Sequence, residues 1–244
     1  GYAVPGVVTG KPLAIGGSLG REDATGRGVT DVTLEALRHL GLDIAGATVA
    51  VQGFGNVGMH TARILHEAGA KVLAVSDAKG GVYNARGLDI PALRSRYQSH
   101  VRPLHECGMG ERISNDDLLQ LECTVLVPAA LSEQITEKNA ARVRCRILAE
   151  GANGPTTMAA DRILEDKGVF VIPDILANSG GVIVSYFEWV QDVQKYFWKE
   201  QDIRDRLHEI ITTAFRGTLE FSQAKKVSLR MAALMSGIDK IGQA

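Results

Sequence analysis

Three glycines, Gly53, Gly55 and Gly58, carry the clearest chemical pattern in this sequence, a G-x-G-x-x-G motif directly after the apolar run 49–51. Between a strand and a helix, the first glycine makes the tight turn, the second lets a pyrophosphate approach the backbone, and the third lets the helix pack against the sheet. The helix then directs free N–H groups and its positive dipole end at the phosphates. The pattern predicts dinucleotide binding, and the residues between the glycines join the same candidate site: Phe54, Asn56 and Val57.

The sequence around this turn supports the prediction, which matters because a glycine pattern alone also occurs in ordinary tight turns. Apolar residues after Gly58 recur at helical spacing up to Gly69, a typical C-terminal residue of a helix. Residues 71–76 predict a second buried strand, and Asp77 closes it about 20 residues beyond the last motif glycine, where an acidic side chain meets the adenosine ribose. A coincidental glycine turn is the alternative that this context disfavours.

The glycine motif and Asp77 can act on one ligand only if a sheet brings the loops that carry them to the same edge. Apolar runs predict further buried strands at 124–128, 146–149 and 169–172. Helical patterns occupy 26–40, 88–98, 116–119, 132–143, 182–197, 202–215 and 229–241, whereas 99–115 is predicted to be irregular. Strands that alternate with helices indicate an α/β fold, a Rossmann-like doubly wound, mostly parallel sheet with flanking helices and a helical C-terminal segment.

In such a sheet, ligands bind where the carboxyl ends of the strands open into loops. Asn56, Asn153 and Asn178 all lie in loops of that kind. Thr25 stands at the predicted start of the helix at 26–40, where its hydroxyl serves either as a cap or as a ligand contact. We expect these side chains to gather around one crevice.

The helix that begins near residue 182 carries a broad apolar stripe, which predicts a buried core face. The stripe consists of Val182, Tyr186, Trp189, Val190, Val193 and Phe197. Ser185 lies on the same side near the start of that helix. Its hydroxyl either bonds back to its own helix or contributes to the crevice.

Composition excludes several classes of protein. The 244 residues hold 27 Lys and Arg against 28 Asp and Glu, so no basic surplus supports binding to nucleic acid. No apolar run is long enough to cross a membrane. Three widely spaced cysteines suit a reducing, cytoplasmic compartment, and the six histidines show no metal-ligand spacing, so no metal site is expected.

The chain is expected to divide into three parts: a Gly/Pro-rich linker or interdomain segment at 1–20, the dinucleotide-binding domain at 21–200, and C-terminal helices at 201–244. Those helices would pack on the same domain or on a missing N-terminal domain. The segment from Gly16 to Gly20 formally fits the G-x-S-x-G nucleophile elbow of hydrolases. It lacks the preceding core strand and the following helix that the elbow needs, which disfavours that function.

Several blocks of the sequence resemble the cofactor domain of glutamate dehydrogenase, within the Glu/Leu/Phe/Val dehydrogenase family, and they follow the family's order over essentially the whole chain. The blocks are Thr9-Gly10-Lys11-Pro12, Gly20-Arg21-Glu22-Asp23-Ala24-Thr25-Gly26-Arg27-Gly28, Gln52-Gly53-Phe54-Gly55-Asn56-Val57-Gly58, Glu150-Gly151-Ala152-Asn153-Gly154-Pro155-Thr156-Thr157, Asn178-Ser179-Gly180-Gly181-Val182 and Ser185-Tyr186-Phe187-Glu188-Trp189. The last block resembles the glutamate branch rather than the leucine or valine branch.

The resemblance implies oxidative deamination of L-glutamate to 2-oxoglutarate and ammonia, with hydride transfer to NAD. It assigns the nicotinamide carboxamide to Thr25 and Asn178, and the nicotinamide ribose to Asn153. Asn56 is implied at the phosphates and ribose, and Asp77 at the adenosine ribose. Val182 and Ser185 are implied to line the substrate pocket, where a neutral hydroxyl donor stabilises a carboxylate without adding charge.

The family's substrate-binding lysines and its proton-transferring aspartate belong to an N-terminal substrate domain that residues 1–244 do not include. No catalytic residue is therefore expected in this chain, and the chain alone is predicted to be inactive, because the general base is missing. The resemblance also implies that the intact polypeptide forms a homo-oligomer, a hexamer.

Three alternatives remain open from the sequence. Asp77 favours NAD because its carboxylate would repel a 2′-phosphate, while Lys79 nearby keeps NADP as the second choice. A dinucleotide-binding module without catalysis is the second alternative. A leucine, phenylalanine or valine dehydrogenase is the third.

Overall fold

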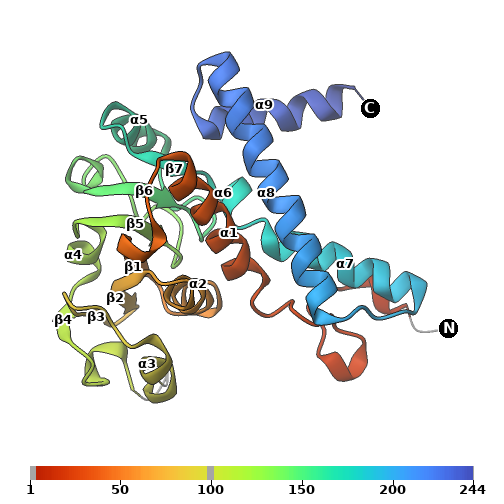
Figure 1. Ribbon diagram of the computed structural model, residues 1–244, viewed down its shortest axis with the longest axis horizontal. Helices are drawn as coiled ribbons and strands as arrows, with labels where there is room; N and C mark the ends of the chain where they lie inside the picture. The colour runs from red at the N-terminus through yellow and green to blue at the C-terminus, as the bar shows by residue number, and fades with distance from the viewer. Residues whose placement is uncertain (1–3, 98–101, 244) are drawn as a thin grey trace.

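The computed structural model describes residues 4–97 and 102–243, and within them seven strands form one sheet (Figure 1). The order across the sheet is β4-β3-β2-β1-β5-β6-β7. The five strands β2, β1, β5, β6 and β7 pair in parallel. At one edge, β3 pairs antiparallel with both β2 and β4. The strands are β1 Thr48–Gln52, β2 Lys71–Asp77, β3 Gly80–Tyr83, β4 Glu111–Ile113, β5 Cys123–Pro128, β6 Cys145–Ala149 and β7 Phe170–Ile172.

Helices cover both faces of this sheet (Figure 1). The α-helices are α1 Ala24–His39, α2 Asn56–Glu67, α3 Ile90–Arg96, α4 Asn115–Leu119, α5 Met158–Asp166, α6 Asp174–Ala177, α7 Gly180–Gln194, α8 Glu200–Lys225 and α9 Leu229–Gly242. Short 3-10 helices are η1 Pro5–Val7, η2 Leu13–Ile15, η3 Ile44–Gly46, η4 Leu104–Glu106 and η5 Ala140–Arg142.

Successive side chains of β1 point to opposite faces of the sheet and pack into two different cores. Val49 and Val51 pack into a core with α1, α2, α3 and α8, whereas Ala50 packs into a second core with α4 and α5. β1 is therefore buried on both sides, as its continuous apolar sequence predicts. The expected Rossmann-like doubly wound sheet, with flanking helices and a helical C-terminal segment, is confirmed.

The predicted helix at 132–143 is wrong. This segment forms a loop that ends in η5, and its backbone bonds to the loop after β6: Glu133 N donates to Gly154 O (2.8 Å) and Ile135 N donates to Pro155 O (2.9 Å). An isolated bridge between Ile135 and Thr156 closes the pairing. Because a neighbouring loop satisfies these backbone groups, the segment has no need of helical hydrogen bonds.

The antiparallel edge was also missed, since no strand was predicted between Asp77 and residue 124 and 99–115 was expected to be irregular. Instead β3 folds back on β2, and β4 adds to β3. Both strands are short, so they carry little periodic signal. The helix predicted at 88–98 is observed as α3, and the end expected at Gln98 lies outside the described residues.

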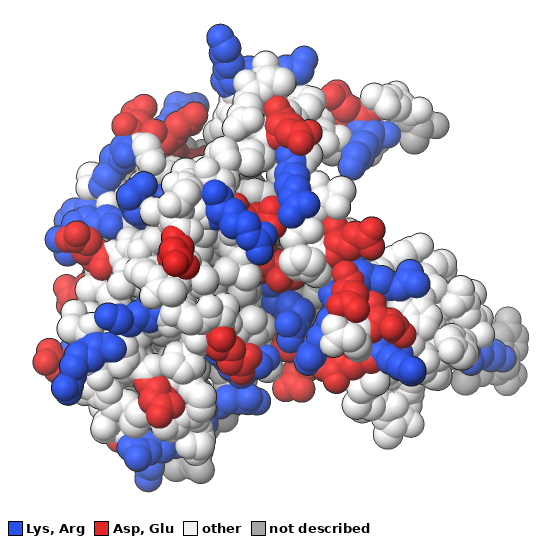
Figure 2. Space-filling view, in the orientation of Figure 1, with Lys and Arg blue, Asp and Glu red and all other residues white. Residues whose placement is uncertain are grey.

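The apolar stripe of α7 is exposed, which corrects the prediction that it is core. Val182, Tyr186 and Trp189 are 68%, 59% and 45% exposed. The opposite face of α7 is buried and carries Glu188 and Gln191. Figure 2 shows a largely uncharged surface over the lobe that α7 and the N-terminal segment form, at the lower right. Helical periodicity identifies an apolar face, but it does not say whether that face is covered.

Polar contacts attach the N-terminal segment to the buried face of α7. The Lys11 ammonium, with only 7% of its side chain exposed, lies 2.5 Å from Glu188 and 2.7 Å from Asp192. Ser18 accepts a hydrogen bond from Gln191 Nε2 (2.9 Å), so the serine of the elbow-like motif has a structural partner. The motif also follows η2 rather than a strand, in contrast to a nucleophile elbow.

Residues 4–97 and 102–243 contain no helix that is both long and apolar enough to cross a membrane. The same residues include no group of three or more His, Cys, Asp or Glu side chains arranged to hold a metal ion.

Candidate functional site

Two glycines of the motif are required by the fold itself. Gly53 has a φ of +93°, and a Cβ there would lie 2.7 Å from Ala129 O in the loop after β5. A Cβ on Gly58 would lie 1.9 Å from Gly53 O. A side chain at Gly58 would push α2 away from β1, and one at Gly53 would push the turn away from the loop after β5.

Gly55 differs, because a Cβ built on it meets no described atom within 4 Å. It is the N-cap of α2, no side chain caps the helix, and the first hydrogen bond runs from Met59 N to Gly55 O (2.9 Å). The amides that precede Met59 in the first turn are therefore available to an external acceptor. An open backbone at the N-terminus of a 12-residue helix fits a phosphate group.

The Phe54 side chain points away from this opening. It is 2% exposed and packs edge-on against Tyr97, with ring centroids 5.3 Å apart. Only the backbone of Phe54 is placed to contact a ligand, so the predicted role of this residue is restricted to its main chain.

A groove of about 810 Å³ opens beside the turn at the carboxyl ends of β5 and β6. Six of the predicted residues line it together: Thr25, Val57, Asn153, Asn178, Val182 and Ser185. They come from α1, α2, the loop after β6, the end of α6 and the start of α7. Gly53, Gly55, Gly58 and Asp77 do not line this groove, and Asn56 lines a neighbouring hollow of about 690 Å³.

Side-chain contacts order the polar wall of the groove. Asn178 Nδ2 donates to Asn153 Oδ1 (2.7 Å), which links the loop after β6 to the end of α6. Thr25 is the second residue of α1 rather than its cap, because the N-cap is Asp23. The capping role considered for Thr25 is thus incorrect, and its hydroxyl lies in the groove wall.

Ser185 is held by a residue that sequence reasoning missed. Arg21 Nε donates to Ser185 Oγ (2.9 Å), and both side chains line the groove. Of the two alternatives considered for this hydroxyl, its place in the groove wall agrees with a contribution to the crevice. A guanidinium beside a hydroxyl is a strong site for a carboxylate, because Arg presents several donors in a fixed plane. The only sequence signal was the place of Arg21 in the same block as Thr25.

Asp77 lies at the carboxyl end of β2, level with the glycine turn, since Gln52 pairs with Ser76 in the register of β1 and β2. Its Oδ1 accepts from Lys79 N (2.7 Å) and its Oδ2 from Leu104 N (3.3 Å). These bonds fix the carboxylate and leave further lone pairs for a ligand, because a carboxylate accepts about four hydrogen bonds.

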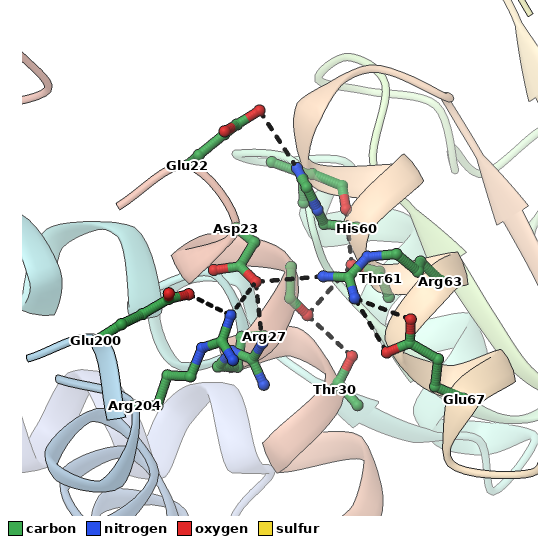
Figure 3. Close-up of polar contacts among 12 residues, drawn as sticks. Glu22, Asp23, Arg27, Thr30, His60, Thr61, Arg63, Glu67, Glu200 and Arg204 are labelled. Carbon is green, nitrogen blue, oxygen red and sulfur yellow. Dashed lines mark hydrogen bonds and ion pairs between the residues drawn. The ribbon is translucent and has the colours of Figure 1, made fainter. Parts of the chain in front are cut away.

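An ion cluster joins α1, α2 and α8 beneath the neighbouring hollow (Figure 3). The carboxylate of Asp23 lies 2.9 Å from Arg27, 3.2 Å from Arg63 and 3.8 Å from Arg204. His60 is buried beside it, and burial lowers the pKa of its imidazole. Within the described part of the chain, neither ring nitrogen of His60 has a hydrogen-bond partner. The cluster fixes the start of α1, on which Arg21 and Thr25 depend.

The glycine turn between β1 and α2, at the point where the strand order reverses, defines a Rossmann-like doubly wound domain with its groove at the switch point. The chain belongs to the Glutamate/Leucine/Phenylalanine/Valine dehydrogenase family, whose model matches residues 16–244. The resemblance inferred from the sequence blocks is therefore confirmed.

Curated relatives match over nearly the whole chain. A glutamate dehydrogenase of Thermotoga maritima is 48% identical over 245 residues, which cover 100% of this chain and 59% of the relative. A cryptic catabolic NAD-specific glutamate dehydrogenase of Bacillus subtilis is 46% identical over 242 residues, which cover 98% of this chain and 56% of the relative. The chain thus spans a little over half the length of these relatives.

The fold agrees with a solved structure of the same class. A hetero-hexameric glutamate dehydrogenase from Thermus thermophilus, in a leucine-bound form, superposes with a TM-score of 0.92 at 34% identity. The match covers 98% of this chain and 56% of that one.

Proposed function

We propose that this chain is the NAD-binding part of a glutamate dehydrogenase, which converts L-glutamate to 2-oxoglutarate and ammonia. The observation that carries the proposal is the groove beside the glycine turn, where Thr25, Asn153, Asn178 and Ser185 meet from separate segments. Residues 21–200 form the dinucleotide-binding domain, 1–20 the interdomain segment, and 201–244 the C-terminal helices.

The cofactor lies across the carboxyl end of the sheet in this proposal. The open backbone at Gly55 and Asn56 receives the pyrophosphate, with Gly53, Phe54, Val57 and Gly58 completing the turn. Asp77 holds the adenosine ribose. Asn153 contacts the nicotinamide ribose, and the carboxamide bonds to Thr25 and Asn178. The nicotinamide ring, when bound, supplies the hydride acceptor.

The substrate occupies the same groove, against Val182 and Ser185. Arg21 joins these residues, since its guanidinium already donates to the Ser185 hydroxyl. Together they offer one charge and one neutral donor to the side-chain carboxylate of glutamate. A leucine, phenylalanine or valine side chain would leave this polar pair without an acceptor, which disfavours that alternative.

NAD is the proposed cofactor, with NADP as the weaker ligand. Asp77 presents a fixed carboxylate where a 2′-phosphate would stand. The Bacillus subtilis relative is named NAD-specific, which supports this choice.

The rest of the catalytic machinery is proposed to reside in an N-terminal substrate domain of the same polypeptide. The groove residues named above bind and orient, but none is placed as a general base, so we propose no catalytic residue in this chain. The intact polypeptide is proposed to be a cytoplasmic homo-oligomer, a hexamer. The Thermus thermophilus relative, which is hetero-hexameric, supports the hexameric order.

Calorimetric titration of the chain with NAD and with NADP tests this proposal. We expect one saturable NAD site and an NADP affinity at least about tenfold weaker, a difference of 1.4 kcal/mol. A chain that is folded by circular dichroism and binds neither dinucleotide would contradict the proposed function. Tighter NADP binding would contradict only the choice of cofactor.

A further inference from the structure

Arg230, in the first turn of α9, reaches into the region beneath the groove. Its Nη2 lies 2.7 Å from Glu150 Oε1, and its Nε lies 2.9 Å from Asp161 Oδ2 on α5. Burial alone would lower the pKa of Arg230, but hydrogen bonds to these two carboxylates raise it, so the guanidinium stays charged. The side chain of Glu150 is 0% exposed, and Arg230 provides its positive counterpart.

The second oxygen of Glu150 orients a different element. Glu150 Oε2 accepts from Asp174 N (2.8 Å), the first residue of α6, while Arg230 Nη1 lies 3.5 Å from Asp174 Oδ1. A buried carboxylate that bonds to both an arginine and a backbone amide is held in one orientation. The start of α6 therefore depends on the position of Arg230.

Asp174 also contacts the loop after β6 through its side chain. Its Oδ2 accepts from Gly154 N (2.7 Å). At the far end of α6, Asn178 donates to Asn153. The two loops that carry Asn153 and Asn178 are thus joined at both ends, and Arg230 supports the end that lies away from the groove.

We infer that Arg230 is a positioning residue for the nicotinamide half of the site, so that the attachment of α9 is coupled to cofactor binding. Arg230 lines no part of the groove, and it acts through Glu150 and Asp174 on side chains that do. Second-layer partners of this kind set the orientation of ligand-binding groups. This inference rests on the proposed function, which supplies the dinucleotide.

The adenosine half of the site has different supports. Asp77 is held by Lys79 and Leu104, and the glycine turn packs against Ala129. None of these contacts involves Arg230. A change at Arg230 should therefore weaken NAD binding but leave ADP binding unaffected, because ADP lacks the nicotinamide and its ribose.

Titrations with NAD and with ADP test the inference on the 244-residue chain. For Arg230→Met we expect the ratio of the NAD dissociation constant to the ADP dissociation constant to rise about tenfold, or 1.4 kcal/mol. Arg230→Lys keeps the charge but loses the planar fork, so a smaller rise in the same direction is expected. If Arg230→Met does not fold, the ratio measured for Arg230→Lys decides the test.

Arg216→Met is the matched control. Arg216 on α8 makes a two-point contact to Glu35 on α1 (2.8 and 3.0 Å), far from either loop. We expect it to change stability without changing the NAD-to-ADP ratio. An unchanged ratio in both folded Arg230 variants, or an equal loss of NAD and ADP binding, would overturn the coupling. Absence of NAD binding by the unsubstituted chain would instead overturn the proposed function.

Discussion

Gly55 and Gly58 lie three residues apart in one turn, yet their missing side chains serve different purposes. A Cβ at Gly58 would collide with Gly53 O, whereas a Cβ at Gly55 would enter open space. Gly58 is needed by the fold, whereas Gly55 leaves the backbone open to the proposed phosphate group. Cofactor binding and folding can therefore be separated by two alanine substitutions.

We expect Gly55→Ala to lower the free energy of unfolding by no more than about 1 kcal/mol, the usual scale of an N-cap change. The same variant should weaken NAD binding at least about tenfold, since the methyl group occupies the phosphate position. Gly58→Ala should lower stability by about 2 kcal/mol or more, because the core cannot absorb the overlap. Urea unfolding and NAD titration measure both quantities. Unchanged NAD affinity in Gly55→Ala would contradict the proposed phosphate site.

Asp77→Asn tests the cofactor preference at one residue. The amide keeps an acceptor oxygen for Lys79 N but removes the charge that repels a 2′-phosphate. The preference for NAD over NADP should fall about tenfold or more, since bonds to a charged group contribute about 1.5–3 kcal/mol. Asp43→Asn is the control, because Asp43 makes a similar bond to Ala45 N at η3. A preference that stays the same in Asp77→Asn would remove this residue from the ribose site.

At the scale of elements, α7 connects the groove to the N-terminal segment. One face starts at the groove with Val182 and Ser185, and the buried face ends at Glu188 and Asp192, which hold Lys11. Burial alone would raise the pKa of Glu188, but hydrogen bonds from Lys11 and from the amides of Gly10 and Lys11 lower it. Burial alone would lower the pKa of Lys11, but its hydrogen bonds to Asp192 and Glu188 raise it.

The pH dependence of this attachment follows from those directions. The lowered pKa of Glu188 contributes stability that is present above its ordinary value of 4.5 and is lost as pH falls through the folded value below it. The raised pKa of Lys11 contributes stability that is present below 10.5 and is lost as pH rises through the folded value above it. We expect the segment to resist limited proteolysis around Gly10 between these limits and to become sensitive outside them.

Lys11→Met should lower the free energy of unfolding by about 3 kcal/mol, because two carboxylates are left without their buried partner. It should also increase proteolysis around Gly10 at neutral pH. Lys71→Met, at an exposed lysine on β2, is the matched control and should change neither property. A Lys11→Met chain as stable as the unsubstituted one would show that the ion pair does not hold the segment.

At the scale of the whole molecule, the sheet order brings loops from distant parts of the sequence to one edge. Ala129 N donates to Gln52 O (2.8 Å), and Gly151 N donates to Pro128 O (3.0 Å), so the loops after β1, β5 and β6 are joined in series. The groove forms along that series. It presents binding groups, whereas the proposed general base and substrate lysines belong to another domain.

We therefore expect the 244-residue chain to bind NAD and to show no glutamate-dependent NADH formation by absorbance. A chimera that joins the upstream part of the Thermotoga maritima relative to this chain should restore turnover. In that chimera, Ser185→Ala should raise the KM for glutamate more than it lowers kcat. The reason is that the hydroxyl is proposed to bind the substrate carboxylate equally in the ground state and in the transition state. Glutamate turnover by the chain alone would contradict the assignment of catalysis to the proposed N-terminal domain.

Local patterns in the sequence were sufficient for most of the fold. The turn at Gly53, the helix after it and the buried strands were predicted, because apolar periodicity and glycine placement act over short distances. The short strands β3 and β4 were missed, and the helix at 132–143 was wrong, because backbone partners far along the chain decided both.

The candidate site shows the same division. The sequence by itself determined the glycine turn between strand and helix, the acidic residue at the end of β2 and the family to which the blocks belong. Only the tertiary structure decided that Arg21 holds Ser185, that Phe54 points into the core, and that the apolar stripe of α7 faces outward. Each of these depends on what packs against a residue from elsewhere in the chain, and no local pattern carries that information.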